Sequence, residues 1–294
     1  MKTISLLFSL LLVCLFYSPV FAIDLGTASG SITIGQDTIV LKHSYAHLHD
    51  NAEGWLDTKK ELRILVTDRD VSRDVIAGMN PFFTLSEMVR EGKIKGALIR
   101  LDPSAPKSIV LTLLTPPKDE RYSLGNKTFS DSTKNPIDSF TISNVRVSGS
   151  FKQVAESNPD MGWPAENYTF TFSAPIFNEQ AVSATLKGKK ALDSKQTKAV
   201  FAVASAMMQG DAEKVQKLST ERKNRQMAQS LAQLPPENMK AMLQEAGRQM
   251  EQTIKKGMLT LIVRGSTASL LVQEKPSGKS MFRVVQKNGI WLVD

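Results

Sequence analysis

The spacing of apolar residues changes near Lys187, and this change constrains the fold more than any other feature of the sequence. Before it, apolar and polar residues alternate, as at Tyr168, Phe170 and Phe172, which is typical of half-buried β-strands. After it, apolar residues recur at every third or fourth position, which is typical of amphipathic helices. The longest such stripe consists of Met239, Met242, Leu243, Ala246, Met250 and Ile254. We therefore expect a multi-domain α+β protein.

Three segments of different character follow from this change. Residues 23–186 are predicted to form a β-rich domain, either an antiparallel β-sandwich or a partly open barrel, with one short helix at 81–92. Residues 187–193, which include Lys187, Lys189 and Lys190, are predicted to be a linker. Residues 194–294 are predicted to form an α+β domain of helices packed on a curved antiparallel sheet, with Asn288 and Gly289 in its last hairpin turn.

The first 22 residues have the features of a secretory signal peptide. Lys2 supplies a positive charge, residues 4–16 are almost all apolar, and Val20, Phe21 and Ala22 match a small-x-small cleavage site. We expect cleavage near Ala22 and a periplasmic or secreted mature protein. The only cysteine, Cys14, would be removed with this segment, and a mature chain without disulfides favours a bacterial periplasm. No later segment is apolar for long enough to span a bilayer.

Charge is distributed unevenly along the chain. Residues 23–186 contain 17 basic and 20 acidic residues, whereas residues 187–294 contain 19 and 9. Such asymmetry indicates separate surfaces with separate partners. The basic clusters contain no interleaved aromatic residues, so we expect no nucleic-acid binding. They suit either weak contact with an anionic envelope surface or an ordinary solvated face.

Three stretches of the C-terminal region carry a family resemblance. They are residues 207–211, residues 263–270 and residues 284–294, the last containing Lys287, Asn288, Gly289, Ile290 and Trp291. They resemble small exported bacterial members of the nuclear transport factor two-like (cystatin-like cone) superfamily. The resemblance implies a cone-like domain over 194–294, an apolar pocket within the cone and, as in many members, a homodimer formed through the sheet. Residues 42–46 and 101–103 resemble exported bacterial domains of unknown function.

The function we expect from these features is binding without catalysis. The partner would be a small apolar ligand or another envelope protein. Candidate pocket residues are Met242, Met250, Phe282 and Trp291, because flexible thioethers and aromatic rings line adaptable apolar pockets. Ordinary core packing explains the same methionines.

The histidines offer an alternative function. All three lie close together, at His43, His47 and His49, followed by Asp50. On a strand these odd positions share one face, so the imidazoles could bind zinc or copper with Asp50 as an oxygen ligand. A metal-binding protein or a hydrolase that uses this strand is therefore the alternative.

A structural role explains the histidines as well. Ile39 and Leu41 have the same parity and are predicted core positions, so the histidines would lie where the strand leaves the core. Their spacing matches no established zinc motif, and we expect no cofactor. The mature sequence also contains no Gly-x-Ser-x-Gly or His-Glu-x-x-His motif, although a carboxylate-based glycosidase stays open.

Overall fold

The computed structural model describes residues 26–52, 54, 58–77, 81–115, 126–129, 137–157, 164–232, 235–274 and 278–294. The predicted signal peptide and its cleavage site lie outside these residues. The predicted α+β class is confirmed, and residue contacts divide the chain into two compact units. The N-terminal unit contains the described residues up to Asp50 together with Lys60–Glu179, and the C-terminal unit contains Asn51–Lys59 and Gln180–Asp294. No helix in the described ranges is long and apolar enough to cross a membrane.

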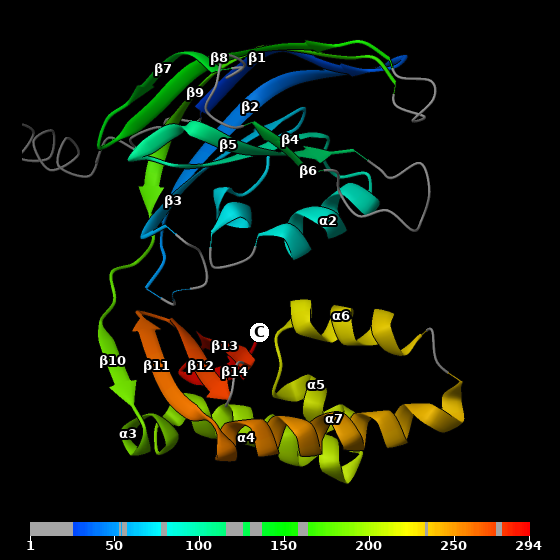
Figure 1. The fold of residues 1–294 in the computed structure, drawn as a ribbon. Coiled ribbons are helices and arrows are strands. Elements are labelled where there is room, and N and C mark those ends of the chain that lie inside the picture. Colours follow the sequence, from blue (N-terminus) through cyan, green and yellow to red (C-terminus); the bar gives the residue numbers. More distant parts are fainter. Residues whose placement is uncertain are drawn as a thin grey trace, which may run out of the picture. The chain divides into compact units, whose positions relative to one another are not determined.

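One nine-stranded sheet, curled into a half-barrel, forms the N-terminal unit (Figure 1). Its strands are β1 (Gly26–Ile34), β2 (Asp37–Asp50), β3 (Lys60–Thr67), β4 (Gly96–Asp102), β5 (Ala105–Leu114), β6 (Asn126–Phe129), β7 (Ile137–Ile142), β8 (Arg146–Ala155) and β9 (Glu166–Asn178). Their order is β6-β5-β4-β3-β2-β1-β9-β8-β7, and the pairs are antiparallel except for a short parallel ladder between β2 and β9. Of the two predicted alternatives, the single sheet corresponds to the partly open barrel and differs from a two-sheet sandwich.

The main core of this unit lies inside the curl of the sheet. Alternate residues of β1 to β5, β8 and β9 meet there, among them Ile64, Leu111, Phe151 and Phe170. The rings of Phe151 and Phe170 are stacked with centroids 5.1 Å apart. Each fully buried side chain of this size contributes about 1.5–3 kcal/mol to folding, which holds the curl closed.

The outer face of β2, β3 and β4 packs against two short helical segments, η1 (Arg73–Ile76) and α2 (Phe82–Arg90). The predicted helix at 81–92 is therefore confirmed. Its apolar face places Leu85 and Val89 against Leu65 and Leu98 of the sheet. Strand β2, which carries the three histidines and is called the histidine strand below, contributes Tyr45 to this second, smaller core.

The alternation of β2 changes face along the strand. Ile39 and Leu41 lie inside the curl, whereas Tyr45 lies on the outer face with α2. The ladder between β1 and β2 shifts register over the same stretch, between Thr27 and Gly30, and such an irregularity increases the local twist. The expectation that Ile39 and Leu41 share a face with the histidines is therefore wrong.

Helices pack on a five-stranded antiparallel sheet in the C-terminal unit (Figure 1). The strands, in sheet order, are β10 (Ala184–Lys187), β11 (Met258–Arg264), β12 (Thr267–Glu274), β13 (Gly278–Lys287) and β14 (Ile290–Val293). The helices are α3 (Lys189–Leu192), α4 (Lys195–Gln209), α5 (Ala212–Lys217), α6 (Glu221–Leu231) and α7 (Pro236–Lys256). The predicted last hairpin is confirmed, and Asn288 and Gly289 adopt φ angles of 50° and 80° in its turn.

Helices α4 and α7 cross closely because α7 carries a glycine at the crossing. A Cβ atom on Gly247 would lie 2.7 Å from the carbonyl oxygen of Ala204 and 2.8 Å from Cβ of Met207. Residues of α4 and α7, such as Val203 and Ile254, therefore join the strands in one core cluster.

The segment 187–193, predicted to be a linker, is regular structure. Lys187 is the last residue of β10, where it pairs with Thr260 of β11, and Ala191 of α3 is buried. The division between the units falls at Glu179, before β10, because β10 is hydrogen-bonded into the C-terminal sheet.

Candidate ligand-binding site

A cavity of about 670 Å³ opens in the C-terminal unit, where α3 and the end of α7 meet the sheet. Its lining is Lys187, Gly188, Leu192, Ile254, Lys255, Gly257, Met258, Leu259, Thr260, Leu271, Val272, Gln273, Lys279 and Ser280. Of these, Ile254, Leu259 and Val272 are buried and form an apolar base. The volume lies within the range of about 300–1,000 Å³ that is typical of small-molecule sites.

The end of α7 shapes the wall of this cavity. Gly257 ends the helix, and its amide donates to the carbonyl of Thr253 at 3.0 Å. A Cβ atom here would lie 2.1 Å from Cγ1 of Val272, so only glycine lets the chain pass this close to β12. The chain then enters β11 at once, and this brings the exposed Met258 to the cavity.

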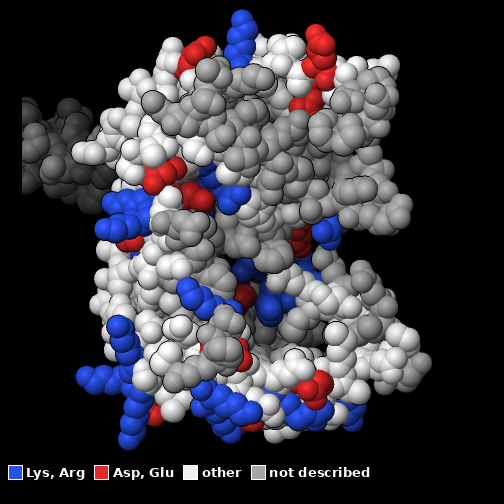
Figure 2. Space-filling view, viewed as in Figure 1, with Lys and Arg blue, Asp and Glu red and all other residues white. Residues whose placement is uncertain are grey.

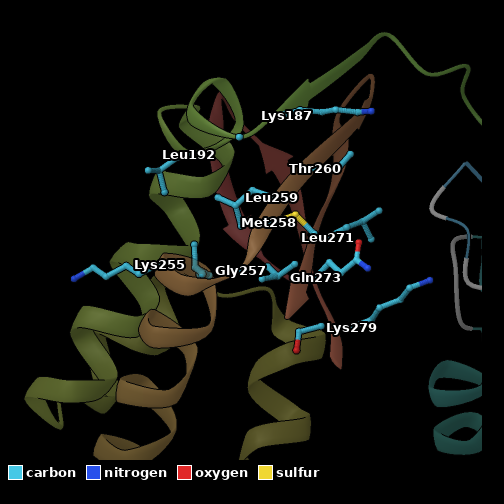
Figure 3. Close-up of a pocket in the computed structure, with 14 residues that line it drawn as sticks. Lys187, Leu192, Lys255, Gly257, Met258, Leu259, Thr260, Leu271, Gln273 and Lys279 are labelled. Atoms are coloured by element: carbon cyan, nitrogen blue, oxygen red, sulfur yellow. The ribbon is translucent and has the colours of Figure 1, made fainter. Parts of the chain in front are cut away.

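Side chains from four neighbouring strands, β10 to β13, share one face of the sheet beside the cavity. Lys187 pairs with Thr260, and Thr260 pairs with Leu271, so the three residues lie on the same face. Figure 3 shows these side chains together with Gln273 and Lys279 on one side of the sheet. Leu192 and Lys255 lie on the other side of β11 in the same view.

The predicted pocket residues do not line this cavity. Met250, Phe282 and Trp291 are each partly buried and pack against the core between helices and sheet. Met242 is 52% exposed on α7 and lies apart from them. Helices α4 and α7 pack closely at Gly247, and Met250 lies in the core beside this contact.

Two of the predicted metal ligands lie in the interior of the N-terminal unit. His47 is 0% exposed and His49 is 1% exposed, with ring centroids 6.3 Å apart. The ring of His47 lies 4.6 Å from that of Phe177, centroid to centroid. Nδ1 of His49 lies 2.9 Å from Oε2 of Glu179, the residue that directly follows β9.

The other two predicted ligands lie apart from this pair. His43 is half-buried opposite Thr67, and Asp50 is exposed and, by alternation, on the opposite face from His49. Within the described residues, no group of three or more His, Cys, Asp or Glu side chains is arranged to hold a metal ion. The structure thus brings His47, His49 and Glu179 together, and metal binding stays a prediction.

Charged residues that the sequence analysis missed lie on the same outer face of the sheet. Nε of Arg63 donates to Oε1 of Glu61 at 2.6 Å, and Nη1 of Arg63 donates to the carbonyl of Ile76 at 3.1 Å. The guanidinium of Arg100 lies 4.5 Å from the ring centroid of Phe82. Burial lowers the pKa of Arg100, the Glu61 carboxylate raises it, and Arg63 lowers it further. The sequence signal that could have found this pair is that Glu61 and Arg63 stand at alternate positions of the otherwise mostly apolar strand β3.

No protein-family model matches this chain, and no curated protein or solved structure matches it. Function is therefore inferred from the residues and their geometry. The C-terminal cavity is open and mixed in polarity, whereas the histidine pair is enclosed.

Proposed function

We propose that the protein is an exported, non-enzymatic binding protein of the bacterial envelope, which holds a small apolar ligand in the cavity of its C-terminal unit. The observation that carries the proposal is the cavity itself, which has an apolar base and a volume of about 670 Å³. Met258 adds an adaptable contact at its opening, because this flexible thioether is 54% exposed there.

The C-terminal unit is also proposed to belong to the cone-like superfamily that its sequence resembles. Two features support this: helices precede a terminal antiparallel sheet, and the chain closes with the hairpin between β13 and β14. On this proposal, the ligand site has moved from the middle of the cone, where Met250 and Trp291 pack, to the end of α7.

Export rests on the sequence of residues 1–22 and has a direct test. Intact-mass measurement of protein isolated from a bacterial envelope fraction should give a chain that begins at Ile23. A chain that retains Met1 in a soluble cytoplasmic fraction would contradict export.

The histidine strand supports the alternative function less well. A hydrolase or a metal-binding site needs an approach for substrate or ion, and both His47 and His49 are enclosed by protein. Nδ1 of His49 already lies beside the carboxylate of Glu179, at 2.9 Å from Oε2. These contacts favour a structural role in packing the outer face of the sheet.

Ligand binding is tested with a neutral apolar fluorophore, N-phenyl-1-naphthylamine, titrated into the full mature chain. We expect saturable fluorescence enhancement, and we expect Met258→Asn to raise the dissociation constant about five- to tenfold, because the probe loses roughly 1 kcal/mol of apolar contact.

Met242→Asn is the matched control for this experiment. Its side chain is 52% exposed, against 54% for Met258, but it lies outside the cavity lining. Its dissociation constant should equal that of the unmodified protein. Equal effects of the two substitutions, or no saturable binding, would rule out the cavity as the site.

A further inference from the structure

The charged side chains that line the cavity all have the same sign. Its lining contains Lys187 from β10, Lys255 from α7 and Lys279 from β13, and it contains no Asp or Glu. Figure 2 shows that Lys and Arg side chains also gather over the region occupied by α3, α4 and α7 in Figure 1. The charged side chains in the lining are therefore all cationic.

Two of the three lysines have no counterion in the part of the chain that the structure describes. Lys255 is ion-paired with Glu251 at 2.8 Å, one turn earlier on α7. Lys187 and Lys279 make no ion pair with a described residue. The carboxylate of Glu274 accepts a hydrogen bond at 3.1 Å from the hydroxyl of Ser280, which is a lining residue.

These two lysines flank apolar surface on a single face of the sheet. Lys187 and Lys279 project on the same side as Leu271 (Figure 3), and Met258 lies between the strands that carry them. The ladder fixes this arrangement, since Lys187 pairs with Thr260 and Lys279 pairs with Gln273. Thr260 and Gln273 add neutral hydrogen-bonding groups beside the lysines.

We propose that the ligand is a free single-chain amphiphile with an anionic head group, a carboxylate or a phosphate ester. Its head group pairs with the ammonium group of Lys187 or of Lys279, and its alkyl chain packs on Met258 and Leu271, which lie on the same face of the sheet as the two lysines. This inference rests on the proposed function and adds the ligand's charge to it. Charge-assisted hydrogen bonds from ammonium groups to such head groups are about twice as strong as neutral ones.

The test compares three ligands with the same ten-carbon chain: decanoate, decanol and decyltrimethylammonium, each below its aggregation concentration. Each competes with the neutral fluorophore on the full mature chain. We expect decanoate to bind about tenfold more tightly than decanol, and decyltrimethylammonium to bind more weakly than either. The preference for decanoate should fall as salt is added, because both lysines lie at an open site.

The double variant Lys187→Gln/Lys279→Gln should bind decanoate and decanol equally, with the affinity for decanol unchanged. The matched control is Lys189→Gln/Lys190→Gln, which removes the same charge from exposed positions of α3 outside the lining. This control should keep the preference for decanoate.

The outcomes separate the two proposals. Equal binding of decanoate and decanol by the unmodified protein overturns the anionic ligand and leaves the apolar site intact. Failure of all three ligands and of the fluorophore overturns both. Binding to phosphatidylglycerol vesicles in flotation, without binding of free decanoate, would assign the lysines to a membrane surface and also overturn the proposal.

Discussion

Two ion pairs of the same length show how differently the two units treat charge. Nε of Arg63 lies 2.6 Å from Oε1 of Glu61 in the N-terminal unit, and Nζ of Lys217 lies 2.6 Å from Oε1 of Glu213 in the C-terminal unit. The side chain of Arg63 is 1% exposed, whereas those of Lys217 and Glu213 are 73% and 77% exposed.

This difference in burial indicates that the buried charges hold the fold together, whereas the exposed charges are free to change partner. A buried guanidinium is held in one position by its desolvation cost, which only its partners offset. The Arg63 pair therefore fixes how η1 lies on the sheet, through the carbonyl of Ile76. Exposed cations lose little on changing partner, so lysines such as Lys187 and Lys279 remain available to a ligand.

Removing the buried cation should have the largest effect. Arg63→Met leaves Glu61 without its closest cation and the carbonyl of Ile76 without this donor. We expect a loss of about 3–5 kcal/mol in the free energy of unfolding, measured by hydrogen exchange of the β3 amides. Arg69→Met is the control, because this side chain is 66% exposed and should change stability by less than about 0.5 kcal/mol. Similar losses in both variants would show that burial is not what gives the Arg63 pair its effect on stability.

An intermediate effect is expected where the C-terminal unit buries a charge of its own. The carboxylate of Asp294 accepts hydrogen bonds from Nη2 of Arg222 at 2.6 Å and from Oγ1 of Thr220 at 2.7 Å. Burial raises the pKa of Asp294, but the hydrogen bonds and charges of Arg222 and its neighbours outweigh it and lower the pKa below the ordinary value of 3.8. The carboxylate therefore stabilises the fold above that value, and its contribution is lost as pH falls through the folded-state pKa.

Asp294→Asn should accordingly lower the free energy of unfolding by about 1–3 kcal/mol at about pH 7. The difference in the free energy of unfolding between this variant and the unmodified protein should become smaller when urea unfolding is repeated at about pH 3. Asp193→Asn, at an exposed carboxylate of the same unit, should show no such pH-dependent gap. A constant difference at both pH values would mean that the charge of Asp294 is not what stabilises this corner.

The smallest effect is expected at the exposed pair. Lys217→Met should lower the free energy of unfolding by about 0.3–0.5 kcal/mol, because an exposed pair four residues apart on a helix gains little in water. Urea unfolding in low and high salt measures it, and salt should remove most of the difference. A loss above about 1 kcal/mol would show that distance, rather than burial, decides the strength of these pairs.

Local patterns predicted the elements of this fold better than their assembly. The stripe from Met239 to Ile254 predicted α7, and Asn288-Gly289 predicted the last hairpin, because both signals lie within one stretch of chain. The sequence could not distinguish a half-barrel from a sandwich, because the half-barrel depends on the pairing of β1 with β9, as at Thr27 and Ser173. No local pattern encodes a pairing between such distant residues.

The candidate site was predicted poorly for the same reason. Lys187, Met258 and Lys279 come together only through the register of β10 to β13, and Lys187 was assigned to a linker from its neighbours alone. The methionine stripe was recognised, but sequence spacing does not tell a pocket from a packed helix crossing. Gly247 decided between them, because its close contact with α4 is visible only in three dimensions.

The position of β1 between β2 and β9 also affects the order in which the units can fold. Every neighbouring pair from β11 to β14 joins consecutive strands, so these four strands can form from local hairpins, whereas β10 pairs across the helices. β1 gains its second neighbour only when β9 arrives from far along the chain, and distant contacts of this kind slow folding. The strand synthesised first in the half-barrel is thus among the last to be completed, and until then one of its edges is open to wrong partners.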